Sequence, residues 1–174
     1  MSSLEQSENL SVRPAVRADL AGIDALLARS YPTLLKADYA PSVLVTAIPL
    51  ISKAQPRLVT SGTYFVVVDS HDVIVGAGGW SRSGPPGMAS GPVTVGHVRH
   101  VVSDHTRLRE GIGRRLMAHI FETARSAGII QLECFSTLTA VPFYAALGFL
   151  QLGPMTVQLR EGIDFPAVHM RRFI

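Results

Sequence analysis

The chain has 174 residues, of which 47% are hydrophobic and 17% charged, and its formal net charge is +3. This length predicts one domain, and the composition is that of a folded protein. The mild basic excess is too small to indicate a general nucleic-acid-binding surface. No segment approaches the ~20 apolar residues of a membrane span, and residues 1–10 lack the apolar run of a signal peptide. Cys134 has no cysteine partner in the chain, so we expect a reducing, cytoplasmic location.

The periodicity of the apolar residues divides the chain into regular elements, and no repeat or linker splits it. A flexible leader, residues 1–10, is expected to precede a single domain over 11–174. Glycines in the strand before Trp80 indicate a bulge or the close approach of another backbone. The expected elements are a strand at 11–16, a helix from Asp19, a second helix after Pro41 that Pro49 should end or kink, a β-hairpin over 63–80 with its turn at 70–72, a strand at 93–102, a helix at 112–125, a strand at 129–135, a short helix ending at Leu147, and strands at 149–159 and 168–173.

The stretch from Arg107 to Arg115 connects a valine-rich strand to the amphipathic helix that follows. The first N–H groups of a helix have no intrahelical partner, and the helix dipole adds about half a positive charge there. Gly111 and Gly113 leave the backbone open to an anion, and the arginines of the stretch add positive charge. The sequence therefore predicts a site of phosphate size at this helix start.

Three other interpretations of Gly111-Ile112-Gly113 compete. A Rossmann fingerprint requires a third glycine where this chain has Leu116, although Glu133 stands at roughly the spacing of that motif's acidic residue. A Walker A loop requires Gly-Lys-Ser/Thr, and this stretch contains no lysine. The simplest interpretation is a helix start whose glycines serve packing.

A second motif, Phe143-Tyr144-Ala145-Ala146-Leu147-Gly148-Phe149, follows after one helix and one strand. Together the two motifs resemble the GNAT (GCN5-related N-acetyltransferase) superfamily, in which Arg/Gln-x-x-Gly-x-Gly/Ala binds the pyrophosphate of acetyl-CoA. The family's first Arg/Gln falls on Leu108, and Thr137 stands where many members have asparagine. The resemblance implies an α/β (α+β) fold, with one domain whose central, mixed, mostly antiparallel twisted sheet of six to seven strands is flanked by about four helices.

The resemblance also implies a function. It is the transfer of an acetyl group from acetyl-CoA to a primary amine of a small molecule or peptide, by direct attack in a ternary complex and without a metal. A non-catalytic acyl-CoA-binding sensor on the same fold is the alternative. Tyr144 would be the general acid for the leaving thiolate, since an ordinary tyrosine pKa near ~10 keeps it protonated. The residues implied to bind the cofactor are Val101, Val102, Ser103, Arg109, Glu110, Gly111, Ile112, Gly113, Arg114 and Thr137.

The general base is left open. His100 is the tentative choice because an ordinary histidine pKa of about 6.5 suits a base. His97, Glu133 and a water molecule are the alternatives. Strict alternation along the strand would place the two histidines on opposite faces.

The acceptor pocket is expected to be built by residues 28–60 and 82–92. Residues 83–92 are rich in glycine, proline and serine, which is typical of an exposed, mobile loop. Trp80 either lines that pocket or lies in the core, and Cys134 is expected to be a buried, inert thiol. We expect no nucleic-acid or membrane partner, and a homodimer is left open.

Overall fold

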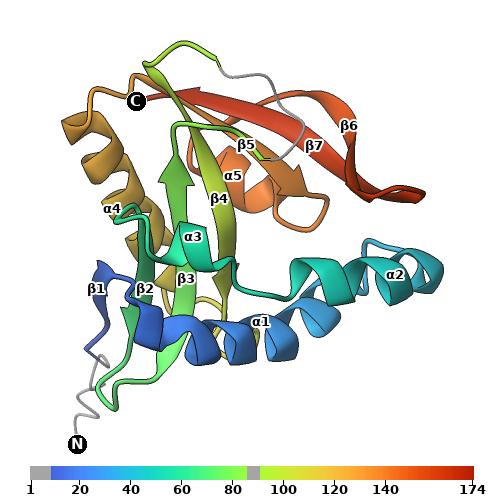
Figure 1. The fold of residues 1–174 in the computed structure, drawn as a ribbon, viewed down its shortest axis with the longest axis horizontal. Helices are drawn as coiled ribbons and strands as arrows, with labels where there is room; N and C mark the ends of the chain where they lie inside the picture. Colours follow the sequence, from blue (N-terminus) through green and yellow to red (C-terminus); the bar gives the residue numbers. More distant parts are fainter. Residues whose placement is uncertain (1–8, 86–90) are drawn as a thin grey trace, which may run out of the picture.

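The computed structural model describes residues 9–85 and 91–174 (Figure 1). Part of the predicted loop at 83–92 therefore lies outside the described residues. The strands are β1 (Ser11–Pro14), β2 (Tyr64–Val68), β3 (Ile74–Ser81), β4 (Val95–Ser103), β5 (Gln131–Thr137), β6 (Leu150–Arg160) and β7 (Ile163–Phe173). They form one seven-stranded sheet in the order β1-β2-β3-β4-β5-β7-β6. The pair β4–β5 is parallel and the other neighbours are antiparallel, so the predicted mixed, mostly antiparallel sheet is confirmed.

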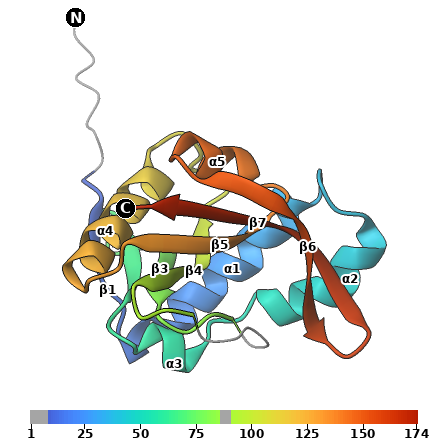
Figure 2. The ribbon, with the colours of Figure 1, turned by 90° about the horizontal axis from the view of Figure 1, so that it is seen from above.

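Helices cover both faces of this sheet, with α4 and α5 on one face and α1 and α2 on the other (Figures 1 and 2). They are η1 (Arg17–Asp19, a 3-10 turn), α1 (Leu20–Leu35), α2 (Pro41–Ile51), α3 (Pro56–Val59), α4 (Ile112–Ser126) and α5 (Val141–Ala146). In the described ranges there are thus five α-helices where about four were expected. The additional helix, α3, is a single turn, too short for periodicity to reveal it. No helix in these ranges is both long and apolar enough to cross a membrane.

Proline positions account for two differences from the predicted elements. Pro49 lies inside α2, which continues to Ile51, so the helix ends soon after Pro49 rather than at it. The last strand begins at Ile163 rather than 168 and includes Pro166. A proline is tolerated there because Ala167 is the last β7 residue paired with β5, which leaves Pro166 on a locally free edge.

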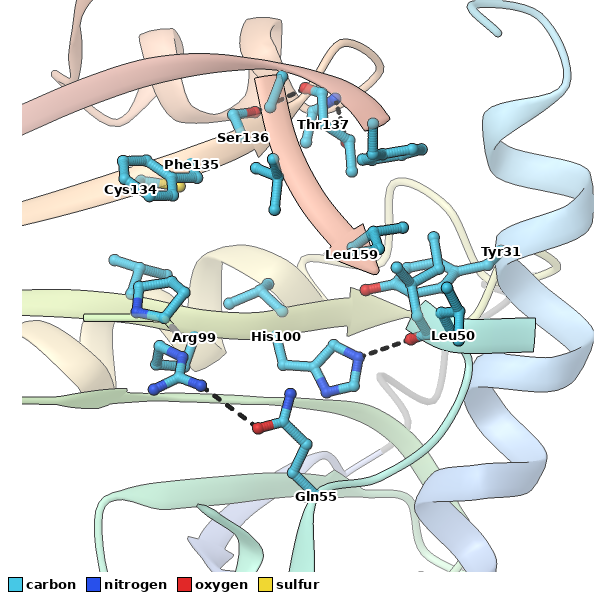
Figure 3. A pocket seen from close by; sticks show the side chains of 18 of the residues that line it. Tyr31, Leu50, Gln55, Arg99, His100, Cys134, Phe135, Ser136, Thr137 and Leu159 are labelled. Carbon is cyan, nitrogen blue, oxygen red and sulfur yellow. Dashed lines mark hydrogen bonds between the residues drawn. The ribbon is translucent and has the colours of Figure 1, made fainter. Parts of the chain in front are cut away.

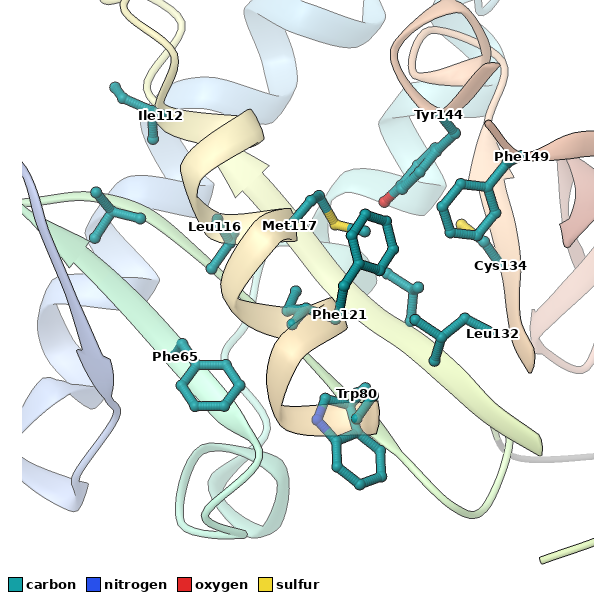
Figure 4. Packing of buried hydrophobic residues seen from close by; sticks show 14 of the residues in the cluster. Phe65, Trp80, Ile112, Leu116, Met117, Phe121, Leu132, Cys134, Tyr144 and Phe149 are labelled. Carbon is teal, nitrogen blue, oxygen red and sulfur yellow. The ribbon is translucent and has the colours of Figure 1, made fainter. Parts of the chain in front are cut away.

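Two hydrophobic clusters hold the helices on the sheet. On the α4 face, Leu116, Met117 and Ile120 are fully buried against strand residues that include Trp80 and Leu132 (Figure 4). The Trp80 indole Nε1 donates a hydrogen bond to Thr123 Oγ1 at 3.1 Å, so Trp80 belongs to the core. The cluster on the other face joins Ile23, Leu26 and Leu27 of α1 to Tyr64, Val66 and Val102 of the sheet.

The parallel pair β4–β5 opens along its length. The two strands pair only over Val95–His97 and Gln131–Glu133, although β4 continues to Ser103 and β5 to Thr137. Backbone groups of β4 beyond His97 that point away from β3 therefore have no strand partner among the described residues. This divergence leaves room for a ligand between the two strands.

A β-bulge lies where β4 leaves β5. Ala77 pairs with Val102 and Gly79 with Arg99, so two residues of β4 stand opposite Gly78. One of them, His100, has a backbone φ of +52°, a value that residues other than glycine rarely adopt. Tyr64 supports the bulge by donating a hydrogen bond from its hydroxyl to the His100 carbonyl at 3.0 Å. The close backbone approach predicted for the glycine-rich strand β3 is confirmed at Gly79, where an added Cβ atom would lie 2.6 Å from Tyr64 Cα.

Candidate functional site

Two cavities lie at the ends of the divergent strands. The smaller has a volume of about 270 Å³ and lies at the start of α4. The larger has a volume of about 490 Å³ and lies between β4 and β5 (Figure 3). The first is called the loop cavity below and the second the strand cavity.

The loop cavity gathers most of the residues predicted to bind a phosphate group. Gly111, with a φ of +76°, is the residue before the first turn of α4, and no side chain caps this helix start. The first backbone hydrogen bond of the helix runs from Arg115 N to Gly111 O at 3.0 Å, so the N–H groups before it have no helical partner. The lining residues are Ser103, Arg107, Leu108, Arg109, Gly111, Ile112, Gly113, Arg114 and Phe143.

Gly113 connects the two sequence motifs in space. A Cβ atom added at this position would lie 2.9 Å from Phe143 Cε2 and 3.0 Å from Cζ. Real Cβ atoms essentially never approach a carbon that closely, so the ring could not keep its place beside a larger residue. The absence of a side chain at Gly113 therefore lets the Phe143 ring close one wall of the loop cavity.

The charges around the loop cavity divide into paired and unpaired groups. Arg107 is held by Asp69 at 3.1 Å and by Glu110 at 2.8 Å. Arg109 and Arg114 are exposed and have no carboxylate partner among the described residues. Glu110, predicted to bind the cofactor through its backbone N–H, is not among the lining residues, and its carboxylate accepts a hydrogen bond from Arg107.

The strand cavity brings together the other predicted site residues except Val102. Tyr144, His100, Val101 and Thr137 all line it, whereas the Val102 side chain is buried in the α1-side core. The segments that were expected to build an acceptor pocket contribute to its wall. The lining residues from that region are Tyr31, Leu50, Ile51 and Gln55, with Pro85 from the loop after β3.

Tyr144 is a buried phenol at the wall of the strand cavity (Figure 4). Burial raises the pKa of Tyr144 well above its ordinary value, and the neighbouring Cys134 thiol adds to that shift. Burial also raises the pKa of Cys134 to about 12. Both groups therefore stay protonated at neutral pH, and Cys134 is buried as predicted.

His100 lies in the same cavity but is already engaged. Its Nε2 is 2.8 Å from the carbonyl oxygen of Ile51, which can only accept, so Nε2 carries the proton. Its Nδ1 is buried and has no hydrogen-bond partner among the described residues. Burial is the largest cause of a lowered pKa at His100, which favours the neutral ring.

The prediction that His97 and His100 face opposite sides of β4 is wrong. Val98 packs in the α4-side cluster, so its neighbours His97 and Arg99 point to the other side. The bulge then turns His100 to that same side, where it reaches Ile51 at the end of α2. Alternation failed because a bulge inserts one residue into the count.

The other two candidate bases do not line the strand cavity. The Nδ1 of His97 lies 3.9 Å from the Glu133 carboxylate, and His169 Nε2 lies 3.7 Å from the same group. Burial is the largest cause of a lowered pKa at His97. These groups form a separate polar cluster where β4 and β5 still pair.

Two residues of the strand cavity, Arg99 and Gln55, were not predicted from the sequence. The hydrogen bond that Thr137 makes within the chain was not predicted either. The Arg99 guanidinium faces the strand cavity and donates to Gln55 Oε1 at 3.3 Å (Figure 3). Thr137 Oγ1 accepts the N–H of Ala140 at 3.2 Å, which supports the turn into α5. The position of Arg99 beside His100 was the available signal, but alternation placed these neighbours on opposite faces.

Comparison with known proteins agrees with this architecture. The model of the acetyltransferase (GNAT) domain matches residues 36–172, which is most of the chain. The chain belongs to the GNAT acetyltransferase family. The match includes both motif regions and the two cavities of this GNAT domain, apart from Tyr31 at the edge of the strand cavity.

Individual acetyltransferases are similar to this chain to different degrees in sequence and in structure. Glucosamine 6-phosphate N-acetyltransferase of Trypanosoma brucei brucei is 34% identical over 64 residues, which cover 37% of this chain and 44% of that protein. A GCN5-related N-acetyltransferase structure from Rhodopseudomonas palustris aligns with a TM-score of 0.74 and 19% identity over 94% of this chain and 95% of that one. The PaiA N-acetyltransferase of Thermoplasma acidophilum, solved in complex with coenzyme A, has a TM-score of 0.67 and 11% identity, covering 95% of this chain and 99% of that one.

Proposed function

We propose that this GNAT protein is an acetyl-CoA-dependent N-acetyltransferase that acetylates a primary amine by direct attack in a ternary complex. The observation that carries the proposal is the contact between Gly113 and Phe143, because it joins the two GNAT motifs at one cavity of phosphate size. Acetyl-CoA would supply the activated thioester carbonyl. A reducing cytoplasm would suit a chain with one cysteine.

The residues of the loop cavity fit a pyrophosphate group. The uncapped N–H groups of the first turn of α4 would donate hydrogen bonds, and the helix dipole favours negative charge at that end. Arg109 and Arg114 would add charge from the rim. The β4 backbone over Val101, Val102 and Ser103 is paired with β3 on one side only, and its open side would bind the pantetheine arm, so the buried side chain of Val102 does not oppose its predicted role.

Tyr144 would protonate the leaving thiolate. Its phenol lies in the cavity and is held neutral by burial, so a proton is available at the neutral pH at which the protein would act. The same burial makes the phenol a weak acid. The departing thiolate would be desolvated in the same cavity, which raises its basicity too, so the proton would pass from the phenol to the sulfur as the C–S bond breaks.

The proton of the acceptor amine would leave through His100 or through water. His100 Nδ1 is the ring nitrogen able to accept it, since Nε2 is committed to the Ile51 carbonyl. A small side-chain movement that exposes Nδ1 to the cavity would be required. A water molecule in the cavity would perform the same step without that movement.

A thiol-release assay with acetyl-CoA and a panel of amines, amino acids and peptides tests the proposal. We expect saturable release of coenzyme A that depends on both substrates, with initial rates of a ternary-complex pattern. If acetyl-CoA binds but no amine causes thiol release, the result contradicts the proposal and favours an acyl-CoA sensor. If acetyl-CoA does not raise the melting temperature at all, both functions are wrong.

A further inference from the structure

Arg99 is a half-buried cation at the wall of the strand cavity. Its Nη1 donates to Ser81 Oγ at 3.0 Å and its Nη2 to Gln55 Oε1 at 3.3 Å. These neutral oxygens take two of the five N–H donors of a guanidinium. They fix the plane of the group between the end of β3 and the segment after α2, while the remaining donors are left for a ligand. Burial lowers the pKa of Arg99, because the charge is costly without an anion beside it.

Three other partly buried arginines are each paired with a carboxylate, while the partly buried Arg171 and Arg172 have no such partner in the described ranges and lie outside the strand cavity. Arg13 binds Asp19 at 2.8 Å, Arg29 binds Asp104 at 3.1 Å, and Arg107 binds Asp69 at 3.1 Å. Arg99 has no such partner in the parts of the chain that the structure describes. A partly desolvated guanidinium held by neutral groups alone is the arrangement expected where the anion comes from outside the protein.

The charges that line the strand cavity also favour an anionic ligand. Its lining includes Arg99 and Arg160 and no aspartate or glutamate among the described residues. An acceptor whose only charge is positive would meet no counter-charge here, whereas an acceptor with a negative group would be attracted.

We propose that Arg99 binds an anionic group, a carboxylate or a phosphate, on the amine that this protein acetylates. This inference rests on the proposed N-acetyltransferase function and adds the chemical class of its acceptor. The forked donors of a guanidinium match two oxygens of either group, so binding would also orient the acceptor. Arg99 precedes the β4 segment Val101–Ser103 by a few residues, which at about 3.3 Å per residue places the anion within roughly 10 Å of the predicted pantetheine arm. An acceptor of a few bonds between anion and amine spans that distance.

Matched pairs of amines test this proposal in the thiol-release assay. L-Methionine is compared with L-methioninamide for a carboxylate, and glucosamine 6-phosphate with glucosamine for a phosphate; further amino acids and amino sugars are paired in the same way. In the unmodified protein we expect kcat/KM to be at least ~10-fold higher for the charged member of at least one pair, equal to about 1.4 kcal/mol. The pair that responds identifies which anion is bound.

Substitution of Arg99 connects the preference to this side chain. Arg99→Gln should raise KM for the charged acceptor by ~10-fold or more and leave KM for acetyl-CoA unchanged, while Arg99→Lys should keep part of the preference. Arg17→Gln, which removes an exposed arginine outside the cavity, is the matched control and should change neither constant. Equal rates for both members of every pair, or equal losses for both in Arg99→Gln, would overturn the proposal.

A further measurement distinguishes failure of the proposed N-acetyltransferase function from failure of the proposed anion binding by Arg99. If no probe causes thiol release, calorimetric binding of the same probes is measured in the presence of acetyl-CoA. Binding of an anionic probe that Arg99→Gln abolishes supports the inference while contradicting the N-acetyltransferase function. No binding of any anionic probe contradicts both. Melting curves verify that Arg99→Gln folds, and Arg99→Lys replaces it if it does not.

Discussion

The loop cavity and the strand cavity are built in different ways. All but one of the loop-cavity residues come from the stretch between Ser103 and Arg114, with Phe143 as the exception. The strand cavity takes its wall from α1, α2, β4, β5, α5, β6 and β7, so residues as far apart as Tyr31 and Arg160 meet there. The first cavity is therefore formed by residues close together in sequence, whereas the second depends on the tertiary fold.

This difference separates two tasks of the proposed reaction. A helix start with unpaired N–H groups binds phosphate whatever the neighbouring side chains are. A wall of side chains can be varied one residue at a time, and each change alters which acceptor fits. We therefore expect changes in the loop cavity to affect cofactor binding, and changes in the strand cavity to affect turnover and acceptor choice.

The largest effect is expected from Gly113→Trp. The indole would displace the Phe143 ring and fill the loop cavity, since even a Cβ atom would lie 2.9 Å from that ring. We expect the affinity for acetyl-CoA to fall by ~100-fold or more, about 2.8 kcal/mol, measured by calorimetry or competition with coenzyme A. Gly113→Ala should weaken binding by less.

Gly91→Trp is the matched control for that substitution. Gly91 is exposed, and a Cβ there would meet nothing within 4 Å. The control should bind acetyl-CoA as the unmodified protein does. Unchanged affinity in a folded Gly113→Trp protein would mean that the pyrophosphate binds elsewhere.

Tyr144→Phe tests the strand cavity. Removal of the phenolic proton should lower kcat by ~100-fold, the range of a general acid, while KM for acetyl-CoA changes by less than about twofold. Tyr39→Phe is the control because Tyr39 is also a buried phenol, but its hydroxyl donates to Pro166 O at 2.7 Å and accepts from Leu138 N at 2.8 Å. It should cost about 1–3 kcal/mol of stability with little loss of kcat. Full turnover in Tyr144→Phe would exclude the phenol as the acid.

The sequence predicted the elements of strongest periodicity closely. The helix expected at 112–125 is α4 at Ile112–Ser126, because its apolar stripe and the glycines at both ends define it locally. The loop cavity was predictable for the same reason, since its residues are neighbours in sequence. Only Phe143 had to be brought in from a distance, and its motif had already been recognised.

The strand cavity could be predicted only in part. Tyr144, Thr137 and the contribution of the early helices were expected, but the bulge at His100 was not placed. A one-residue bulge reverses the face of the residues beyond it, so a count of alternating positions assigned His97 and His100 to opposite sides. Arg99 was missed because its significance depends on lacking a carboxylate, and only tertiary structure reveals which arginines are paired.

A smaller effect on acetyl-CoA binding is expected when the two arginines at the rim of the loop cavity are replaced. Arg109→Gln combined with Arg114→Gln should raise KM for acetyl-CoA by ~3- to 10-fold, because exposed charges contribute up to about 1 kcal/mol each. The increase should shrink at high salt, where these interactions are screened. Arg125→Gln, in the last turn of the same helix, is the control. An equal increase in the control would mean that overall charge, rather than the loop cavity, is responsible.

The smallest effect concerns His100 and the pH dependence of stability. Burial lowers the pKa of His100 in the folded protein, so below the ordinary value of about 6.5 the unfolded chain binds a proton that the folded chain does not. The stabilising contribution is complete above that pH and is lost as pH falls through it toward the lowered pKa. Thermal melts of the unmodified protein should therefore show a decline between pH 7 and pH 5.

His100→Gln should reduce that decline by a few degrees, since a glutamine does not titrate while its amide can still donate to the Ile51 carbonyl. His71→Gln, an exposed histidine in the β2–β3 turn, should leave the decline unchanged. His97 also has a pKa lowered by burial and will retain part of the effect in the variant. If His100→Gln melts with the same pH dependence as the unmodified protein, the His100 ring titrates as it does in water, and its Nδ1 is then open to the strand cavity as a general base requires.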